Sequence, residues 1–418
     1  MSGGTVHVIG AGLAGLAAAL SLSAAGRTVA LHEAAGHAGG RCRSYIDPRL
    51  GCRIDNGNHL LLSANRSALA YLAEIGASGS LRAGDAAFAF HDIADGRQWT
   101  VRPGEGGVWR RLTAPLRQVP GAGAADALGL LRLAVAGRRS TVMQALGPGA
   151  LMERFWRPLT VAVLNAEPEV ASARLLRGVI REVLRTGEAV PLTAREGLSE
   201  SFVDPALAVL AERGVGIGFG RRLRGVDTAN DRATALRFAE ETVALAPGDA
   251  LVLAVPAPIA AGLLPGLAVP DGSSAIVNAH FRLDAPAHLP GRADLIGLTG
   301  GTAQWLFRRG EIASVTVSAA DALLDRPSED LAAILWRDIA PVLGLAGQAQ
   351  PPARIVKERR ATFRQDPASL ARRPPARTAW RNLALAGDWT DTGLPATIEG
   401  AIRSGRDAAS LLISGTGR

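Results

Sequence analysis

The segment VHVIGAGLAGLAAAL, residues 6–20, decides the fold of this 418-residue chain. Its opening apolar residues predict a short buried strand, and the small apolar residues of 13–25 predict a helix. Between them lies a G-x-G-x-x-G turn, in which Gly10 permits the bend, Gly12 admits a phosphate, and Gly15 lets the helix pack on the strand. This pattern predicts that a dinucleotide binds at the turn, through Gly10, Ala11, Gly12, Ala14 and Gly15.

A second predicted strand supports the same interpretation. Residues 28–33, TVALHE, end in the carboxylate of Glu33. In dinucleotide-binding folds an acid about 20 residues after the glycines accepts hydrogen bonds from a ribose diol. An acid at this place disfavours NADP, which requires an arginine there. The chain therefore has the pattern of a dinucleotide site, for which NAD and FAD both stay open.

The segments GGRCRS (39–44) and DNGNH (55–59) favour FAD over NAD. Gly39 and Gly40 allow the backbone to pass close to the phosphates and ribityl chain of the longer cofactor. Arg41 offers its guanidinium group to a phosphate or to the flavin edge, although a surface loop with a solvated arginine is the alternative. The turn that follows is expected to lie beside the flavin, through Gly57, Asn58 and His59.

The carboxyl-terminal part of the chain supplies the other side of the expected site. Residues 382–386 predict a buried strand, after which Gly387 and Asp388 bring a carboxylate to the ribityl hydroxyl groups. Pro395 precedes a helix that begins near residue 396, and its free N–H groups are expected to face the flavin pyrimidine, where charge develops on reduction. Small residues are expected to pack against the flat ring: Gly400, Ala401, Ser404 and Gly405.

Several of these motifs together resemble a known family. They are Gly39-Gly40-Arg41, DNGNHLLL at 55–62, residues 156–165, QWLF at 304–307, and LAGDWTDTGLPATIEG at 385–400. The chain resembles hydroxysqualene dehydroxylase, also called squalene-associated FAD-dependent desaturase, within the amine oxidase and phytoene desaturase superfamily. The resemblance spans nearly the whole chain. It implies that FAD also contacts Trp389, Pro395, Thr397 and Ile398, and that Leu223 meets the adenine, where a plain sheet residue is the alternative.

The implied fold is α/β, with a discontinuous Rossmann-type FAD-binding domain and an α+β substrate domain. A chain of 418 residues is long enough for two such cores. The FAD-binding domain is expected to contain residues 1–75, 211–256 and 376–418, and the substrate domain residues 76–210 and 257–375. Within these limits the sequence predicts helices at 125–138 and 175–185, and strands at 214–219, 222–226, 250–256, 274–283 and 314–318.

Composition is that of a globular protein, with 48% apolar and 20% charged residues. The two cysteines, Cys42 and Cys52, show no metal-ligand spacing, so neither a metal site nor a disulfide is expected. The net charge is +8 and Lys357 is the single lysine. The arginines are scattered without an aromatic stripe, which argues against nucleic-acid binding.

The resemblance implies a substrate that resides in a bilayer, so a basic face resting on anionic lipid is favoured over a nucleic-acid surface, with ordinarily solvated arginines as the alternative. The sequence offers no run of about 20 apolar residues that would span a membrane. Residues 124–136 are too short for this and carry Asp126 and Arg132; they are expected to line a tunnel or to dip into one leaflet. No signal peptide is recognised before the first strand. We therefore expect a cytoplasmic protein that associates peripherally with the inner face of the membrane, with contact to the upstream synthase left open.

The reaction implied by the resemblance belongs to squalene and hopanoid biosynthesis. It removes the allylic hydroxyl group of hydroxysqualene and gives squalene, with reduced FAD as the hydride source. An acid would assist departure of the hydroxyl group while apolar walls exclude water. The candidates for this role, each with a structural role as the alternative, are His59, Asn165, Asp391 and Glu399.

Three rival functions stay open from the sequence. A carotenoid desaturase would also act on a long polyene. An amine oxidase would be expected to place a lysine near the flavin, and Lys357 in IVKERR, residues 355–360, looks instead like a strand end beside an acid. A non-catalytic flavin-binding scaffold would not require both a flavin-facing helix and a substrate-sized tunnel.

Overall fold

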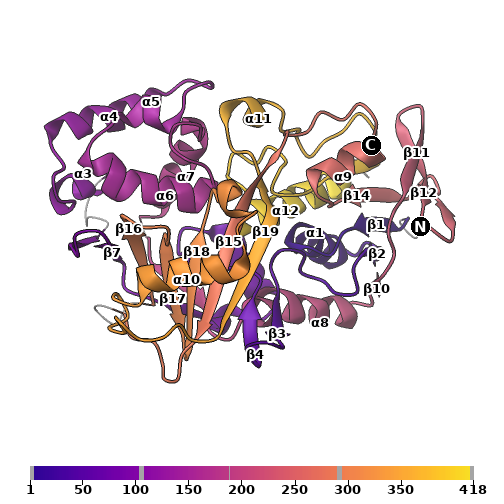
Figure 1. Cartoon of the computed structure of the whole chain (residues 1–418). Helices are drawn as coiled ribbons and strands as arrows, with labels where there is room; N and C mark the ends of the chain where they lie inside the picture. The colour runs from indigo at the N-terminus through magenta and orange to yellow at the C-terminus, as the bar shows by residue number, and fades with distance from the viewer. Residues whose placement is uncertain (1–3, 103–107, 188, 290–293, 415–418) are drawn as a thin grey trace.

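A computed structural model describes residues 4–102, 108–187, 189–289 and 294–414. The molecule has two parts (Figure 1). One part, on the right of the figure, contains a five-stranded sheet, and the other contains a seven-stranded sheet with a group of helices beside it.

The five-stranded sheet joins three distant segments of the chain. Its strand order is β10–β2–β1–β14–β20, and every neighbouring pair is parallel. The strands are β1 (Val6–Ile9), β2 (Val29–His32), β10 (Gly216–Gly218), β14 (Ala250–Leu253) and β20 (Leu383–Leu385). The expected Rossmann-type α/β fold is therefore confirmed, and the loops after β1, β2, β14 and β20 meet at the carboxyl edge of one sheet.

Both faces of this sheet are covered. Consecutive strand residues point to opposite sides, so each strand contributes side chains to the core on either face. Val8 and Val252 pack with four helices: α1 (Leu13–Ala24), α2 (Arg66–Glu74), α8 (Asp204–Glu212) and α12 (Ile398–Ser414). Ile9 and Leu253 belong to the core on the other face, which involves β11 (Gly225–Ala229), β12 (Arg232–Arg237), β13 (Thr242–Ala244) and α9 (Ala257–Leu263). The apolar runs of these strands are thus explained by burial on two sides.

Helix α8 joins the core of the five-stranded sheet through Ala206 and Leu210. These residues precede position 211, where the second segment of the FAD-binding domain was placed. The division into domains stays a prediction, and the packing of α8 favours an earlier start of that segment.

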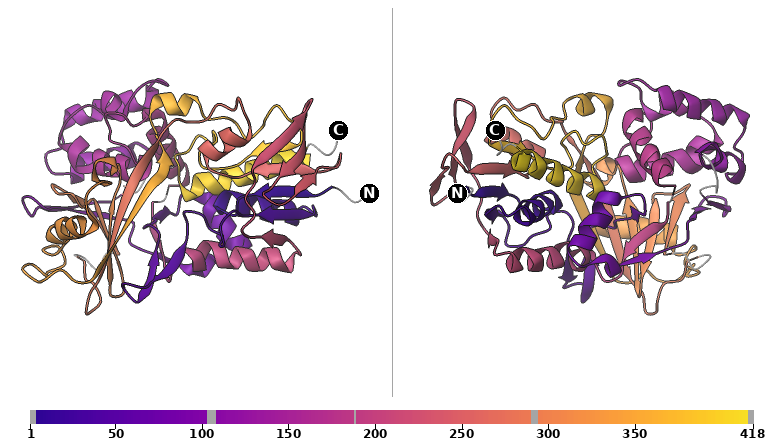
Figure 2. Two further views of the ribbon diagram at one scale, coloured as in Figure 1. Left: turned by 45° about the vertical axis from the view of Figure 1, so that its right-hand side comes forward. Right: turned by 180° about the vertical axis from the view of Figure 1, so that it is seen from behind.

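Helices α1 and α12 lie against each other at a glycine (Figure 2). A Cβ on Gly405 would lie 2.1 Å from the carbonyl oxygen of Ala14, so the two backbones meet where a larger residue does not fit. Ser404 Oγ accepts a hydrogen bond from the Gly387 N–H group at 2.8 Å. The expectation that Ser404 and Gly405 pack against a flat ring was therefore wrong, because both contact the protein itself.

The seven-stranded sheet has the order β19–β15–β18–β17–β16–β7–β8, and its pairs are antiparallel except for β16 with β7. Its strands are β7 (Phe88–Asp92), β8 (Gln98–Val101), β15 (Ser273–Arg282), β16 (Leu295–Thr299), β17 (Trp305–Arg309), β18 (Ile312–Val317) and β19 (Ala353–Phe363). Helix α10 (Ser328–Ile339) packs on one face, against residues such as Val277 and Val315. The side chains between these apolar positions, such as Asn278 and Thr316, point to the opposite face.

A helical group packs beside β7, β8, β16 and β17 and shares an apolar core with them. It contains α3 (Val108–Gln118), α4 (Ala124–Val135), α5 (Val142–Leu146), the π-helical turn Met152–Trp156, α6 (Arg157–Leu164) and α7 (Ala173–Thr186). The smaller elements are β3 (Ser44–Asp47), β4 (Cys52–Asp55), β5 (Leu61–Leu62), β6 (Leu81–Ala83), β9 (Pro191–Ala194), α11 (Pro367–Ala371), a second π-helical turn (Ser199–Val203), and the 3-10 turns Ser78–Ser80 and Asp321–Leu323.

Most predicted elements are present, with shifted ends. Helix α4 stops at Val135 because Ala136 leaves the helical conformation, at φ −54° and ψ 131°, whereas the sequence extended the helix to residue 138. Strand β11 begins at Gly225 and not at 222, so Leu223 is a buried loop residue ahead of the strand. Among the described residues, no helix is long and apolar enough to cross a membrane.

Candidate functional site

The glycine turn between β1 and α1 combines two kinds of glycine. Gly10 has φ +104°, and a Cβ on Gly15 would lie 1.8 Å from the Gly10 carbonyl oxygen, so both positions require glycine for the fold. A Cβ on Gly12 would instead have no heavy atom within 4 Å. Gly12 therefore leaves open space at the amino end of α1, where a phosphate group can approach the backbone.

Two neighbouring loops complete this edge. The Glu33 carboxylate accepts hydrogen bonds from the N–H groups of Ala11, at 2.7 Å, and Ala35, at 2.8 Å. The Gly39 N–H group donates to the Ala11 carbonyl oxygen at 2.8 Å, and a Cβ on Gly40 would lie 3.5 Å from the Cα of Gly12. The structure thus brings the glycine turn, the acid and the glycine pair together.

Arg41 connects this edge to the carboxyl-terminal motif. Its guanidinium group forms an ion pair with Asp388 at 2.7 Å and donates to the carbonyl oxygen of Ala361. The negative charge of Asp388 raises the pKa of Arg41. The residue before Asp388 must be glycine, because Gly387 has φ +146° and a Cβ there would meet the ring of Trp389. Trp389 is itself buried, and its Nε1 donates to the Val255 carbonyl oxygen at 2.9 Å.

The same motif is held from behind by Arg373, which the sequence reasoning missed. The guanidinium group of Arg373 is buried and stacks over the Phe363 ring at 5.1 Å. It donates hydrogen bonds to the backbone carbonyl oxygens of Asp388, Trp389, Thr390 and Leu394. Burial lowers the pKa of Arg373 to about 10. Its neighbour Arg372 is exposed and pairs with Asp271, so no local pattern distinguishes the two arginines.

Gln365 is a second residue without a sequence signal. It is fully buried, and it links the end of α6 to the approach to α12. Its Nε2 donates to the Leu164 carbonyl oxygen at 2.7 Å, and its Oε1 accepts from the Ala396 N–H group at 2.9 Å. In the first turn of α12, Thr397 Oγ1 accepts from the Gly400 N–H group at 3.1 Å, which satisfies one free amide of that helix end.

The turn of residues 56–59 lies against the polar face of the seven-stranded sheet. Asn58 Nδ2 donates to Thr316 Oγ1 at 3.0 Å, and Thr316 Oγ1 donates to Asn278 Oδ1 at 2.9 Å. A Cβ on Gly57 would lie 3.1 Å from Asn278 Nδ2, so the backbone passes close to the strand. Sequence alternation in β15, with apolar Val277 followed by Asn278, is the signal that could have identified this polar face.

His59 is partly buried at the end of this turn. Its Nδ1 lies 3.0 Å from the carbonyl oxygen of Gly57, and because a carbonyl oxygen only accepts, Nδ1 carries a hydrogen atom. Among the described residues, none forms a hydrogen bond with His59 Nε2, which is therefore available to a ligand. Burial lowers the pKa of His59, and the positive charge of Arg41 acts in the same direction.

The other three candidates for the acid make different contacts. Asn165 is buried, with φ +46°, and its amide binds the Ser274 carbonyl oxygen, Thr362 Oγ1 and the Ala319 N–H group at 2.6–3.1 Å. Buried Glu399 accepts from the first N–H groups of α2 and from Arg403. Asp391 is exposed in a turn. None of these three contacts His59 or Arg41 through a hydrogen bond or ion pair within the described parts of the chain.

Lys357 lies on β19, and its ammonium group donates to the carbonyl oxygens of Leu324 and Arg326. The sequence predicts a strand end beside an acid at Lys357; the structure instead places this residue inside β19, with backbone carbonyl oxygens as partners of its ammonium group. These contacts direct the ammonium group to the segment before α10.

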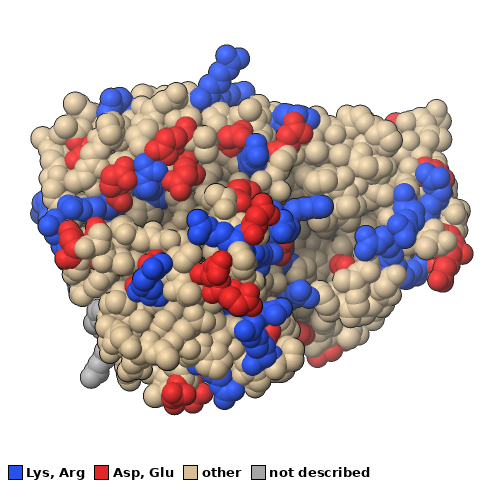
Figure 3. Space-filling view, in the orientation of Figure 1, with Lys and Arg blue, Asp and Glu red and all other residues tan. Residues whose placement is uncertain are grey.

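The turn of residues 56–59 has apolar neighbours on the side of the helical group. Leu60, directly after His59, packs on the core of the helical group together with Phe88, Phe155 and Phe307, which are only partly buried. On the face seen in Figure 3, a hollow lies between the two parts of the molecule, with Lys and Arg side chains on both rims. The glycine turn with its open space at Gly12, the adjacent acid and the Arg41–Asp388 pair fit a flavin dinucleotide that bridges the two parts. These features define an FAD-dependent oxidoreductase.

Comparison with known proteins agrees with this class. The chain belongs to the family of flavin containing amine oxidoreductases, which it matches over residues 13–413. It is 48% identical to a hydroxysqualene dehydroxylase of Rhodopseudomonas palustris over 98% of both chains, and 23% identical to a probable zeta-carotene desaturase of Synechococcus elongatus over 98% of both. The solved structure of a putative protoporphyrinogen oxidase from Exiguobacterium has a similar fold, with a TM-score of 0.71, 17% identity and 99% of both chains covered.

Proposed function

We propose that this enzyme removes the allylic hydroxyl group of hydroxysqualene reductively and releases squalene. The observation that carries the proposal is the full-length similarity to the hydroxysqualene dehydroxylase of Rhodopseudomonas palustris. When bound, reduced FAD supplies the hydride that replaces the hydroxyl group. The hydroxyl group takes up one proton and leaves as water, so the alcohol, a hydride and a proton are converted to the hydrocarbon and water.

The residues of the cofactor site divide between the two parts of the molecule. We assign the phosphates to Gly10, Ala11, Gly12, Ala14, Gly15 and the loop Gly39, Gly40 and Arg41, and the ribose to Glu33. The flavin end is assigned to Gly57, Asn58, His59, Gly387, Asp388, Trp389, Pro395, Thr397 and Ile398, and the adenine side to Leu223. Most of these residues lie near the carboxyl edge of the five-stranded sheet, and Gly57, Asn58 and His59 lie against the seven-stranded sheet, which supports an assignment that divides the cofactor between the two parts.

His59 is our candidate for the proton donor. Its Nδ1 hydrogen bond to Gly57 fixes the ring and leaves Nε2 to carry the proton that the departing hydroxyl group requires. The lowered pKa makes protonated His59 a stronger acid, although it is less populated at neutral pH. Leu60 and the aromatic residues beyond it exclude water that would otherwise capture an allylic cation.

The remaining candidates fit structural roles better. Asn165 and Glu399 use their polar atoms to hold α6 and α2 in place, and a proton donor would have to give up those contacts. The exposed side chain of Asp391 accepts from the Gly393 N–H group of its own turn at 3.3 Å. We expect substitutions at these three positions to affect folding or FAD retention before they affect the protonation step.

The test is an anaerobic reaction of the purified flavoprotein with detergent-dispersed hydroxysqualene after chemical reduction of the flavin. Squalene and oxidised flavin are expected to form in equal amounts, and no squalene from fully reduced, FAD-loaded protein would contradict the proposal. His59→Gln is expected to lower the rate by about 10²–10³ while FAD stays bound. The wild-type rate should fall as the pH rises above the lowered pKa of His59, and exposed His288→Gln serves as the control.

A carotenoid desaturase is the alternative function, because its substrate is also a long polyene. The same protein with phytoene and an oxidised flavin distinguishes the two, since the proposed enzyme leaves phytoene unchanged. An amine oxidase is disfavoured by the backbone partners of Lys357. A non-catalytic scaffold would leave the flavin reduced when hydroxysqualene is added.

The place of action is part of the proposal. A substrate of this chemistry partitions into lipid, so we expect the enzyme to work in the cytoplasm at the inner face of the membrane. Direct transfer of hydroxysqualene from the synthase that forms it would shorten the path through water, and co-purification of the two proteins would test that contact.

A further inference from the structure

Helix α4 exposes three large apolar side chains on one face. Leu128, Leu131 and Val135 are 60%, 50% and 81% exposed, and we call them the α4 stripe. Their spacing places them on the same side of the helix. Leu130 and Leu133 occupy the opposite side and are buried in the core of the helical group. The stripe is therefore exposed even though the opposite side of the same helix is packed into the core.

No other element in the described part of the chain presents such a group. The remaining exposed large apolar residues lie singly on separate elements or loops: Ile46, Val170, Phe219, Ile259 and Ile413. Single exposed apolar residues are ordinary in globular proteins. A contiguous row on one helix face costs solvation free energy, and it indicates a surface that is covered in use.

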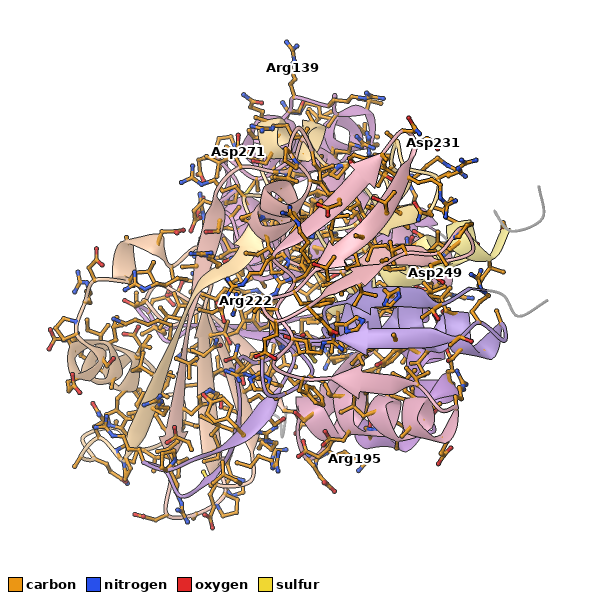
Figure 4. The ribbon with its side chains drawn as sticks, turned by 90° about the vertical axis from the view of Figure 1, so that its right-hand side faces the viewer. Arg139, Arg195, Arg222, Asp231, Asp249 and Asp271 are labelled. Carbon is orange, nitrogen blue, oxygen red and sulfur yellow. The ribbon has the colours of Figure 1, made fainter. Side chains whose placement is uncertain are left out.

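The charges beside the α4 stripe are mostly positive. Arg132 lies on the helix itself, and Arg138 and Arg139 follow it in an exposed loop. Figure 4 shows Arg139 directed away from the body of the molecule. Between residues 108 and 142 the single acid is Asp126, and its carboxylate already accepts from the Gly123 N–H group at 2.8 Å. Among the described residues, none of the three arginines forms an ion pair with an acid.

We propose that the α4 stripe, with Arg132, Arg138 and Arg139, docks on the surface of an anionic phospholipid bilayer. A helix of 12 residues is about 18 Å long, which is too short to cross a hydrocarbon core of about 30 Å. It suits a position in the interface, where apolar side chains enter the acyl region and arginines meet lipid phosphates. Pairing of two such faces would bring like charges together, which disfavours a second copy as the occupant. The inference deepens the proposed location at the membrane by naming the surface that docks there, and it does not depend on the proposed reaction.

The experiment measures co-sedimentation of the FAD-loaded protein with vesicles, in the absence of substrate. Vesicles of phosphatidylcholine and phosphatidylglycerol in equal amounts should bind the wild-type protein, and vesicles of phosphatidylcholine alone should bind it at least several-fold more weakly. The variant Leu128→Ser/Leu131→Ser/Val135→Ser is expected to lower the partition coefficient about tenfold or more. Arg138→Ser/Arg139→Ser should lower it about tenfold and remove most of its salt dependence.

Two matched controls accompany these variants. Ile46→Ser/Ile259→Ser/Ile413→Ser removes three exposed apolar residues elsewhere, and Arg326→Ser/Arg337→Ser removes two exposed arginines near or on α10. Both controls should bind vesicles as the wild-type protein does. Loss of binding in the controls to the same extent, or wild-type binding by either α4 variant, would overturn the proposal. So would a wild-type protein that ignores both vesicles and instead forms a dimer that the stripe variant dissociates. Failure of the proposed reaction would leave vesicle binding unchanged, so the two ideas are tested separately.

Discussion

Arg41 and Asp388 lie 347 positions apart in the sequence and form an ion pair of 2.7 Å. The pair joins the loop that follows β2 to the loop that follows β20. The Asp388 side chain is 9% exposed, whereas that of Arg41 is 45% exposed. The carboxylate therefore fixes the guanidinium group from the protein side and leaves its other side free for a ligand.

Asp388→Asn keeps the shape of this contact and removes its charge. We expect the Kd for FAD to rise about tenfold or more, because Arg41 loses the partner that orients it. Titration of the apoprotein with FAD, followed by flavin fluorescence, gives the value. Asp231→Asn breaks the exposed pair with Arg381 and is the control, with an unchanged Kd. A Kd for Asp388→Asn within twofold of the wild type would contradict this role.

Two glycines of the first turn should respond differently to alanine. Gly12→Ala adds a methyl group in open space, so the apoprotein should fold with a normal melting temperature. The same methyl group occupies the approach to the amino end of α1, and FAD affinity should fall at least about tenfold.

Gly15→Ala would instead place a Cβ 1.8 Å from the Gly10 carbonyl oxygen and should destabilise the apoprotein by several kcal/mol. Thermal unfolding with and without FAD separates the two cases. Equal melting temperatures for the two apoprotein variants would show that the turn is wider than described.

Sequence reasoning located the elements around the cofactor because each of them rests on local chemistry. The glycine turn, Glu33 at the end of β2, and the strand before Gly387 are all specified within a few residues. The residues that contact these elements from distant parts of the chain are not specified by any local pattern. The pairing of Arg41 with Asp388, and the packing of Gly405 on Ala14, depend on which surfaces meet after folding, and the sequence shows only that small or charged residues are present.

The catalytic candidates show the same limit. His59 lies in a motif that the sequence predicts beside the flavin, and the structure places it close enough to Arg41 for the guanidinium charge to lower its pKa, while its catalytic role stays a prediction. Asn165 is a candidate as a polar amide among apolar residues, and Glu399 as an acid at the start of the helix expected to face the flavin, but such residues also cap helices and bridge segments. Gln365 and Arg373 carry no motif at all, since their importance comes from backbone groups of distant segments.

Arg373 is expected to set the shape of residues 388–394. Lysine cannot reproduce its several hydrogen bonds to backbone carbonyl oxygens, and burial of the shorter cation leaves some of them unpaired. Arg373→Lys should destabilise the apoprotein by about 2–4 kcal/mol and weaken FAD binding about tenfold or more. Arg372→Lys, at its exposed neighbour, should change neither quantity.

The decisive readout for Arg373 is the flavin itself. If the arginine shapes the loop, the absorption spectrum of FAD bound to Arg373→Lys should shift, and Arg372→Lys should retain the wild-type spectrum. Suppose instead that Arg373→Lys is less stable but binds FAD with the wild-type Kd and, when saturated, shows the wild-type spectrum. That result would show that Arg373 supports the fold and not the cofactor.

Stability should fall on mild acidification because of His280. This residue is 1% exposed on β15, its Nδ1 lies 2.8 Å from Ser314 Oγ, and burial lowers its pKa to about 4. In the unfolded chain a histidine titrates near pH 6.5. Between these values the unfolded state binds a proton that the folded state refuses, so stability is complete above about pH 6.5 and declines as the pH falls toward 4.

At pH 5 the loss from His280 amounts to about 2 kcal/mol. His280→Asn retains a polar group near Ser314 and cannot titrate, so it should be less stable than the wild type at pH 7.5 and recover most of that difference at pH 5. Buried His32, whose pKa is also lowered to about 4, lowers the stability of both proteins equally and cancels in the comparison. His288→Asn, at an exposed position, should follow the wild type at each pH. A stability difference between wild type and His280→Asn that is the same at both pH values would mean that His280 accepts a proton in the folded protein.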